Sequence, residues 1–245
     1  ERVKERIADK KVLELIRRFL KQEILDNGVV RAPEYDGTPQ GATLSPLLCN
    51  IYLNPLDHLM IEKGYEMIRY ADDLVIVCRS QKEAERALSV LKQWVETNGL
   101  ELHPEKTRIA DMTQKRGHFD FLGYRFYRSD KGKLTRFPAP KSVKRLRDKL
   151  KKPTRRANGK SMEEIIRCCN RVLIGWFAYF KHSHRWAFHE LDSWLRMRLR
   201  SINRKRRKGK GKGRGLDHIR WPNAYFAKLG LFSMHATRGE ATSPR

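Results

Sequence analysis

Residues 66–78, Glu66-Met67-Ile68-Arg69-Tyr70-Ala71-Asp72-Asp73-Leu74-Val75-Ile76-Val77-Cys78, decide the fold of the first half of the chain. Two runs of β-forming residues flank two adjacent acids, which predicts two strands joined by a tight hairpin with Asp72 and Asp73 at its tip. Mg²⁺ takes only one or two protein carboxylates and completes its octahedron with other oxygens, such as substrate phosphates. The adjacent aspartates therefore indicate a metal site, although aspartate is also a common turn residue and that second interpretation stays open on these residues alone.

The charge of the chain is distributed unevenly. The 245 residues carry a formal net charge of +25, yet residues 1–128 hold 21 Lys and Arg against 20 Asp and Glu. Residues 129–245 hold 32 against 8, so nearly all of the excess positive charge lies in the second half. Solvated protein surfaces usually mix both signs. The imbalance therefore predicts a region that binds a polyanion such as nucleic acid, joined to a nearly neutral region.

The cysteines and the hydropathy pattern exclude two classes of protein. The four cysteines form no CxxC pair, which argues against a zinc site and favours buried thiols in a reducing compartment. The sequence has no apolar run long enough to span a membrane. We therefore expect a cytoplasmic protein that works without a membrane.

The first half is predicted to mix helices and strands. Helices are expected at 10–24 behind an Asp9 cap, from Ser45 to about Leu59, and from a capping box at Ser80 to a stop at Gly99. A strand is expected at 106–112 and one further short β element at 119–127. Helix, hairpin, helix and strand is the order of a ferredoxin-like split βαβ, which needs one more strand in front.

The second half is predicted to form a small helical bundle. Apolar residues recur at helical spacing over 143–150, 162–180 and 186–202, and Ser161 opens the second of these segments with a capping box. The run 204–215 interleaves glycine with cations, so we expect a flexible basic loop there.

Six segments, in order along the chain, resemble motifs of the bacterial group II intron reverse transcriptase/maturase family. Tyr70-Ala71-Asp72-Asp73 is similar to the catalytic YADD box of that family. The other segments are Gly37-Thr38-Pro39-Gln40-Gly41 with 44–53, then 102–107, Phe121-Leu122-Gly123-Tyr124, 174–180, and Trp221-Pro222-Asn223 with Gly230-Leu231. The resemblance implies an α+β fold, with a reverse-transcriptase palm and part of the fingers over 1–128. An α-helical thumb or maturase domain would follow over 129–245.

The resemblance also implies that part of the family protein is missing from this chain. The palm of the family has a third catalytic carboxylate on a strand that the resemblance places before residue 1. The split βαβ would then lack its first strand, and a missing N-terminal segment would be one partner. No cysteine-rich segment resembling the HNH endonuclease domain of the family follows the maturase part.

The resemblance assigns roles to individual residues. Asp72 and Asp73 would be catalytic metal ligands at a two-metal Mg²⁺ site, and Lys106 would stabilise or protonate the departing pyrophosphate. The nucleotide and template pocket would consist of Pro39, Gln40, Gly41, Tyr70 and Ala71. The primer grip would consist of Leu122, Gly123 and Tyr124. RNA-binding cations would be Lys144, Arg145, Lys151, Lys152, Arg155, Arg156, Arg204, Lys205, Arg206, Arg207 and Lys208.

Several of these roles have a plain structural alternative. Lys106 also fits an ordinary surface lysine, and Tyr124 fits core packing as well as a primer grip. Trp176 and Phe180 are expected in the core rather than as platforms for bases.

The resemblance implies an RNA-directed DNA polymerase of a group II intron that also binds intron RNA and assists splicing. Its partners would be intron RNA, an RNA template with a DNA primer, and deoxynucleoside triphosphates, in a bacterial cytoplasm. The alternative is a non-enzymatic RNA-binding maturase, or a truncated relic without the upstream aspartate.

Overall fold

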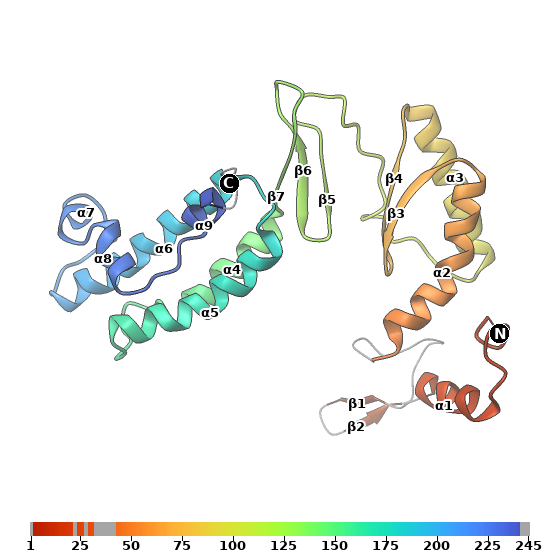
Figure 1. Ribbon diagram of the computed structural model, residues 1–245, viewed down its shortest axis with the longest axis horizontal. Helices are drawn as coiled ribbons and strands as arrows, with labels where there is room; N and C mark the ends of the chain where they lie inside the picture. Colours follow the sequence, from red (N-terminus) through yellow and green to blue (C-terminus); the bar gives the residue numbers. More distant parts are fainter. Residues whose placement is uncertain (1, 22–23, 27–28, 32–42, 241–245) are drawn as a thin grey trace. The chain divides into compact units, whose positions relative to one another are not determined.

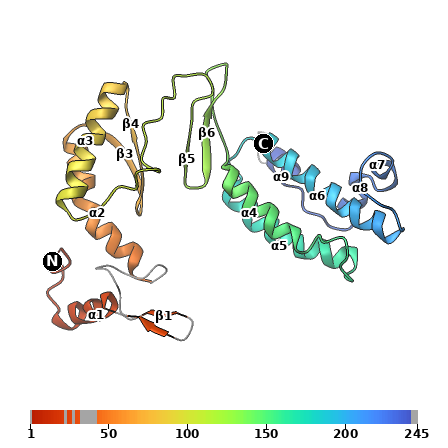
Figure 2. The same cartoon turned by 180° about the vertical axis from the view of Figure 1, so that it is seen from behind.

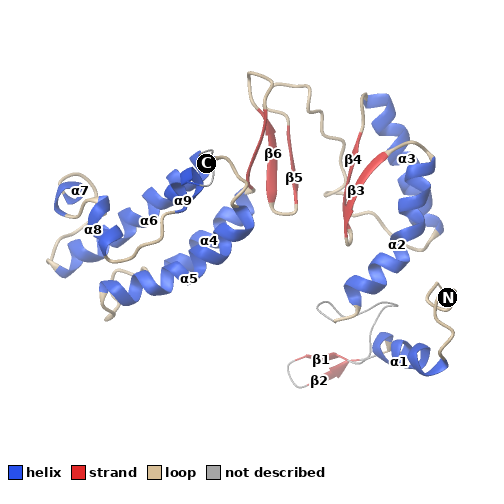
Figure 3. Ribbon diagram, viewed as in Figure 1, coloured by secondary structure: helices blue, strands red, loops and turns tan. Residues whose placement is uncertain are grey.

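The computed structural model describes residues 2–21, 24–26, 29–31 and 43–240, drawn in colour in Figure 1. The chain divides into two compact units, residues 1–109 and 110–245. Both units contain helices and strands, as expected for an α+β protein. Figure 3 shows the helices in blue and the strands in red. Among the helices of the described ranges, none combines the length and the apolar character needed to cross a bilayer.

The first unit begins with the short helix α1, Lys10–Leu20. Asp9 caps it as predicted, because its side chain accepts hydrogen bonds from two backbone N–H groups of the first turn. The prediction that this helix continues to residue 24 was wrong. Ile24–Asp26 (β1) pairs antiparallel with Val29–Arg31 (β2) instead, so its backbone takes part in a strand ladder.

The predicted order of helix, hairpin and helix is confirmed next. α2 spans Ser45–Glu62, β3 spans Glu66–Tyr70, β4 spans Asp73–Val77, and α3 spans Gln81–Thr97. β3 and β4 pair antiparallel over their full length, with Tyr70 opposite Asp73 at the turn. Ser80 caps α3, and Gly99 follows it with a φ of +67°, a conformation that glycine adopts without strain.

Both helices pack on one face of the β3–β4 hairpin. Figures 1 and 2 show α2 and α3 beside the two strands from opposite sides. The buried core residues are Leu53, Leu56, Met60, Ala87, Leu91 and Val95, with the half-buried Met67, Leu74 and Ile76 of the hairpin packed against them. This packing fixes the hairpin on a helical layer and leaves its turn at the edge.

The predicted strand at 106–112 was wrong. Residues 104–106 form a turn and 107–111 have no regular structure. The backbone N–H groups of Lys106 and Thr107 both donate to the carbonyl of His103, at 3.2 and 3.0 Å, so they are used locally rather than in a ladder. Within the described part of the first unit, the strands form two separate two-stranded sheets, and no continuous split βαβ sheet is assembled.

The second unit opens with a three-stranded antiparallel sheet. Its strands, in the order β5–β6–β7, are His118–Phe121, Tyr124–Arg128 and Leu134–Pro138. The single β element expected at 119–127 is therefore a hairpin of two strands, and β7 was not predicted. Leu122 and Gly123 form its two-residue turn with φ values of +48° and +75°, both in the left-handed region that tight hairpin turns use.

A helical layer follows the sheet, as predicted. Its helices are α4 (Pro140–Lys151), α5 (Met162–Phe180), α6 (Arg185–Arg206), α7 (Asp217–Arg220), α8 (Asn223–Lys228) and α9 (Met234–Glu240). The Ser161 capping box is present in full. One apolar cluster joins α4, α5, α6, α8 and α9, with Phe188, Phe226 and Leu199 completely buried in it. Phe180 is buried in this cluster, so its predicted place in the core is confirmed, and the half-buried Trp176 packs against the same cluster.

The basic run 204–215 is not the free loop that we predicted. α6 continues through Arg206, and the Arg204 guanidinium donates to Asp217 and to the carbonyl of Lys210, at 2.8 and 2.7 Å. Gly213 is buried against α6, where its N–H donates to the Ser201 hydroxyl at 2.8 Å. Glycine is required there because a Cβ would lie 2.4 Å from the Cβ of Arg200.

Candidate functional site

The two aspartates lie at the tip of the β3–β4 hairpin. Ala71 and Asp72 form its two-residue loop, Asp73 begins β4, and both carboxylates are exposed. Ala71 has a φ of +53°, which costs an alanine free energy and is a kind of backbone strain found at functional sites. Burial and the negative charge of Asp72 raise the pKa of the Cys49 thiol on α2.

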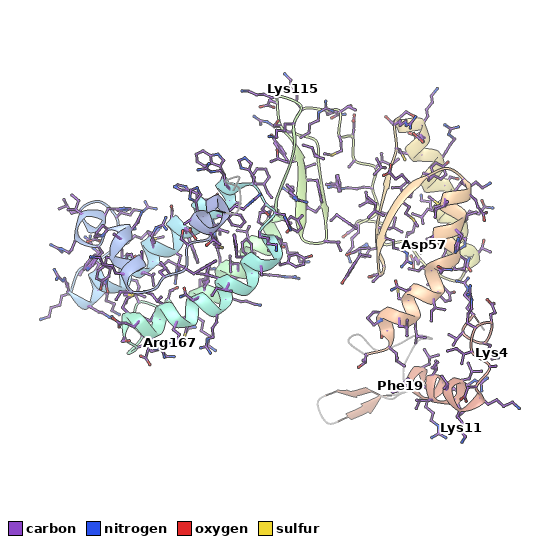
Figure 4. All side chains as sticks on the ribbon, in the orientation of Figure 1. Lys4, Lys11, Phe19, Asp57, Lys115 and Arg167 are labelled. Atoms are coloured by element: carbon purple, nitrogen blue, oxygen red, sulfur yellow. The ribbon has the colours of Figure 1, made fainter. Side chains whose placement is uncertain are left out.

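Arg69 fastens this tip to α2. Its Nε and Nη2 donate to the two carboxylate oxygens of Asp57 at 2.7 and 2.5 Å, a bidentate pair. Its Nη1 donates to Asn50 Oδ1 at 2.9 Å and to the carbonyl of Ala71 at 2.8 Å. Figure 4 labels Asp57 on α2. One guanidinium therefore joins the helix to the peptide that directly precedes Asp72.

The surroundings of Arg69 make this connection rigid. The Arg69 side chain is only 10% exposed and Asp57 is 29% exposed, so the ion pair is partly shielded from solvent. The hydrogen bonding of Arg69 to the Asp57 carboxylate is the largest influence on the guanidinium and raises its pKa. A charged group that is held at four points leaves little freedom to the loop that it anchors.

Sequence reasoning missed Arg69, although a signal was present. β3 alternates exposed and half-buried residues, and Arg69 occupies an inward position of that alternation. An inward arginine needs an acidic partner, and Asn50 and Asp57 lie seven residues apart on one face of the preceding helix, α2.

The donor set at the hairpin tip fits Mg²⁺. Asp72 and Asp73 offer hard carboxylate oxygens, and neither accepts a hydrogen bond from a side chain in the described ranges, so their lone pairs are available to a cation. Over those ranges the chain has no cluster of three or more His, Cys, Asp or Glu side chains that is able to hold a metal by itself. Two carboxylates leave most of the octahedron to phosphates, water or a further acid.

The other residues assigned to nucleotide chemistry are placed only in part. Pro39, Gln40 and Gly41 lie outside the described residues. Tyr70 ends β3 opposite Asp73, and its ring is exposed. Lys106 is exposed in the turn at 104–106, in the same unit as the aspartates. The structure therefore brings Tyr70, Ala71, Asp72 and Asp73 together and leaves the role of Lys106 a prediction.

The predicted primer-grip residues form the β5–β6 turn of the second unit. The carbonyl of Gly123 accepts hydrogen bonds from Ala139 N at 2.8 Å and Ser142 Oγ at 3.1 Å. The Tyr124 hydroxyl donates to the carbonyl of Tyr179, and its ring lies 5.0 Å from that of Phe180. Burial raises the pKa of Tyr124. The Tyr124 side chain therefore packs on α5, and Leu122 and Gly123 supply the turn.

The predicted RNA-binding cations form two groups. The first group, here called the α4 cations, is exposed along α4 and the loop that follows it: Lys144, Arg145, Lys151, Lys152, Arg155 and Arg156. In the second group, Lys205, Arg206, Arg207 and Lys208 are exposed at the end of α6, whereas Arg204 is committed to Asp217 and Lys210. Cations on one helix and its adjoining loop suit contacts with phosphates rather than bases.

A buried arginine, Arg200, gives Trp221-Pro222-Asn223 a structural role. The sequence did not single this arginine out. Arg200 of α6 is fully buried, its Nε donates to the carbonyl of Trp221 at 2.8 Å, and its Nη2 donates to Asn223 Oδ1 at 2.7 Å. Desolvation lowers the pKa of Arg200. These residues therefore hold the C-terminal helices onto α6 and are structural.

The comparisons with known proteins define the class of this chain. Residues 2–126 match the family described as reverse transcriptase (RNA-dependent DNA polymerase), and residues 143–221 match the group II intron, maturase-specific domain. Because the first match covers more than half of the sequence, the chain belongs to the reverse transcriptase family, in the form that carries a group II intron maturase domain. The resemblance inferred from the motifs is confirmed.

Three curated proteins illustrate the relationship. The group II intron-encoded protein LtrA of Lactococcus lactis subsp. cremoris is 47% identical over 57 residues, which is 23% of this chain and 9% of LtrA. Protein YkfC of Escherichia coli K12 is 27% identical over 161 residues, 51% of this chain and 41% of YkfC. The retron Mx65 reverse transcriptase of Myxococcus xanthus is 39% identical over 82 residues, 32% of this chain and 18% of that protein. The chain spans less than half the length of each relative.

Proposed function

We propose that this chain is the polymerase and maturase part of a group II intron protein, which copies RNA into DNA and binds intron RNA to assist splicing. The observation that carries this proposal is the exposed Asp72-Asp73 pair on a hairpin tip that Arg69 anchors, in a chain of the reverse transcriptase family. The matched maturase domain and its basic surface support the RNA-binding half.

Each residue of the tip has a distinct task in this proposal. Asp72 is the main ligand and Asp73 the weaker ligand of Mg²⁺, which, when bound, supplies positive charge to the triphosphate and to the attacking and leaving oxygens. Arg69 holds the Ala71 carbonyl and keeps the Asp72 backbone in one position. Ala71 is small and leaves room for the primer terminus, and Tyr70 lies beside it.

The remaining chemistry concerns the nucleotide and the pyrophosphate. Gln40, with its sequence neighbours Pro39 and Gly41, contributes to the nucleotide and template pocket that the family resemblance implies, where a backbone without bulk would let nucleotide and template approach. Lys106 steadies the charge of the departing pyrophosphate or gives it a proton, a role that suits a flexible ammonium group. Gly123 and its neighbours in the β5–β6 turn support the primer strand.

RNA binding belongs mainly to the basic second half. The α4 cations and the exposed cations at 205–208 contact phosphates of intron RNA and of the template. The partners that we propose are intron RNA, a primed RNA template and deoxynucleoside triphosphates, in a bacterial cytoplasm.

Primer extension with Mg²⁺ on an RNA template tests this function. The chain is assayed as it stands and again behind a segment that supplies the third carboxylate expected from the family resemblance. Extension by at least the longer version is expected. RNA binding without extension by either version would overturn the polymerase assignment and leave a maturase.

A further inference from the structure

The connection between α5 and α6 concentrates positive charge around one exposed aromatic ring. Its sequence is Lys181-His182-Ser183-His184-Arg185-Trp186. Trp186 is 67% exposed at the start of α6, where Trp176 and Trp221 of the same unit are packed in or against the core. The nearest ring is that of His189, 5.9 Å away and edge-on at 75°. A tryptophan this exposed has a large apolar face with no partner in the described second unit.

The backbone around this ring is fixed by the neighbouring strand. Arg136 of β7 donates from Nε to the carbonyl of His182 at 2.8 Å, and the N–H of His184 donates to the carbonyl of Arg136 at 2.8 Å. Ser183 between them is buried. The His184 ring packs on Phe137 at 5.4 Å. The turn is thus hydrogen-bonded to β7 on both sides of Ser183, so the backbone that carries Trp186 is held in place.

The charged side chains within the turn itself are all cationic, and the acid one helical turn beyond Trp186, Glu190, is paired with Arg147 at 2.8 Å. Lys181, His182 and Arg185 are exposed within it. After desolvation, the influences that lower the pKa of His184 are the positive charges of Lys133, Arg185 and Arg238. The neutral His184 ring is needed locally, because its Nδ1 accepts the N–H of Trp186 at 3.4 Å and caps α6. Cations from the loop before β7, from α6 and from α9 therefore lie near the turn.

A rigid aromatic face with clustered cations matches the chemistry of unpaired nucleic acid. In single-stranded RNA the bases are free to stack on an aromatic side chain while cations follow the phosphates. In a duplex the base faces are already stacked on each other, so only the phosphates would profit from this surface.

We propose that Trp186 and the cations of residues 181–185 form a site for single-stranded RNA, in which one unpaired base stacks on the indole ring. The site lies outside the α4 cations and the end of α6, and it rests on the proposed RNA-binding function. Its specific claim is that the base, as well as the phosphate, is recognised here.

Binding by the full chain tests the site. The probes are fluorescein-labelled oligouridine, the same oligomer with abasic riboses, and an RNA duplex of equal length, each measured by anisotropy. Trp186→Ala should weaken oligouridine binding by roughly tenfold, since stacking on one aromatic side chain has about that effect. Trp186→Phe should retain most of the affinity. Ile174→Ala, on α5 and 52% exposed in the wild type, is the matched control for removal of an exposed apolar side chain and should have no effect.

The abasic oligomer and the duplex separate stacking from charge. Both should bind Trp186→Ala as they bind the wild type. An equal loss for all three probes, or no loss for oligouridine while the wild type binds it, would overturn the stacking site alone. Failure of the wild type to bind any of the RNAs would overturn the RNA-binding function and this site with it. Unchanged melting temperatures of the variants exclude misfolding as the cause of a loss.

Discussion

Replacement of Arg69 by lysine tests how the hairpin tip is held. The variant keeps a positive charge near Asp57 but loses the planar fork that bonds both carboxylate oxygens, Asn50 and the Ala71 carbonyl. A lysine ammonium is a compact donor that cannot reproduce this geometry. We therefore expect the β3–β4 turn to open more often, while the helices that bury the core stay in place.

The expected loss in the free energy of opening follows from how well the Arg69–Asp57 ion pair is shielded from solvent. The Arg69 side chain is 10% exposed and that of Asp57 is 29% exposed. Hydrogen bonds to charged groups contribute about 1.5–3 kcal/mol each, and lysine retains part of the charge interaction. A loss of about 2 kcal/mol in the free energy of opening corresponds to roughly thirtyfold faster amide exchange.

Hydrogen exchange read by mass spectrometry measures this opening segment by segment. Peptides over 66–77 should exchange faster in Arg69→Lys, and peptides over β5–β7 should not change. Arg79→Lys, an exposed arginine just after β4, is the matched control. Exchange over 66–77 within about twofold of the wild type would refute the anchoring of the tip by Arg69.

Three further predictions concern the second unit. Gly213→Ala should lower the free energy of unfolding of this unit by about 1–3 kcal/mol, because the new Cβ would lie 2.4 Å from Arg200 Cβ. Gly159→Ala, where the new Cβ would meet open space, is the control, and equal melting temperatures of the two variants would contradict the prediction. Burial and nearby cations lower the pKa of His184, so its stabilisation is complete above the ordinary value of 6.5 and is lost as pH falls through and below it. His184→Asn should therefore flatten the fall in melting temperature between about pH 7 and pH 5, and an unaltered slope would argue against the cap. Glutamine at all six α4 cations should weaken RNA binding and reduce its salt dependence with little change in melting temperature, and an unaltered salt slope would show that they do not contact phosphates.

The sequence was sufficient where local chemistry determines structure. Asp9, Ser80 and Ser161 are caps that bond backbone groups within three residues, and the periodic apolar faces of α2, α3, α5 and α6 follow from helical spacing. The β3–β4 hairpin is determined in the same way by two β-forming runs that enclose a short turn.

The errors arose where contacts in the fold override what a segment prefers by its own composition. Residues 106–112 have the composition of a strand, but the turn at His103 uses the backbone locally. β7 pairs with β6 across the turn at 129–133, whose Asp130 and Gly132 are turn residues that the sequence-based prediction did not use. The run 204–215 has the composition of a loop, yet Arg204 is paired with Asp217 and Gly213 packs closely against α6. Composition describes what a segment prefers by itself, and these contacts override that preference.

The sequence predicted the metal-binding chemistry of the candidate site but not the residues that hold the surrounding elements in place. The aspartates and their exposure followed from the hairpin, whereas the roles of Arg69 and Arg200 depend on partners in other elements, α2 for Arg69 and residues 221–223 for Arg200. A buried arginine is visible in the sequence only as an unexplained charge at an inward position.

Primer extension by Asp72→Asn tests the central claim most directly. The variant is measured in the version that carries the third carboxylate, beside Asp130→Asn, an exposed acid of the second unit, as the control. Loss of the carboxylate removes the main metal ligand, so extension should fall below detection while RNA affinity stays near that of the wild type. Extension by a folded Asp72→Asn protein within about tenfold of the wild type would contradict the account.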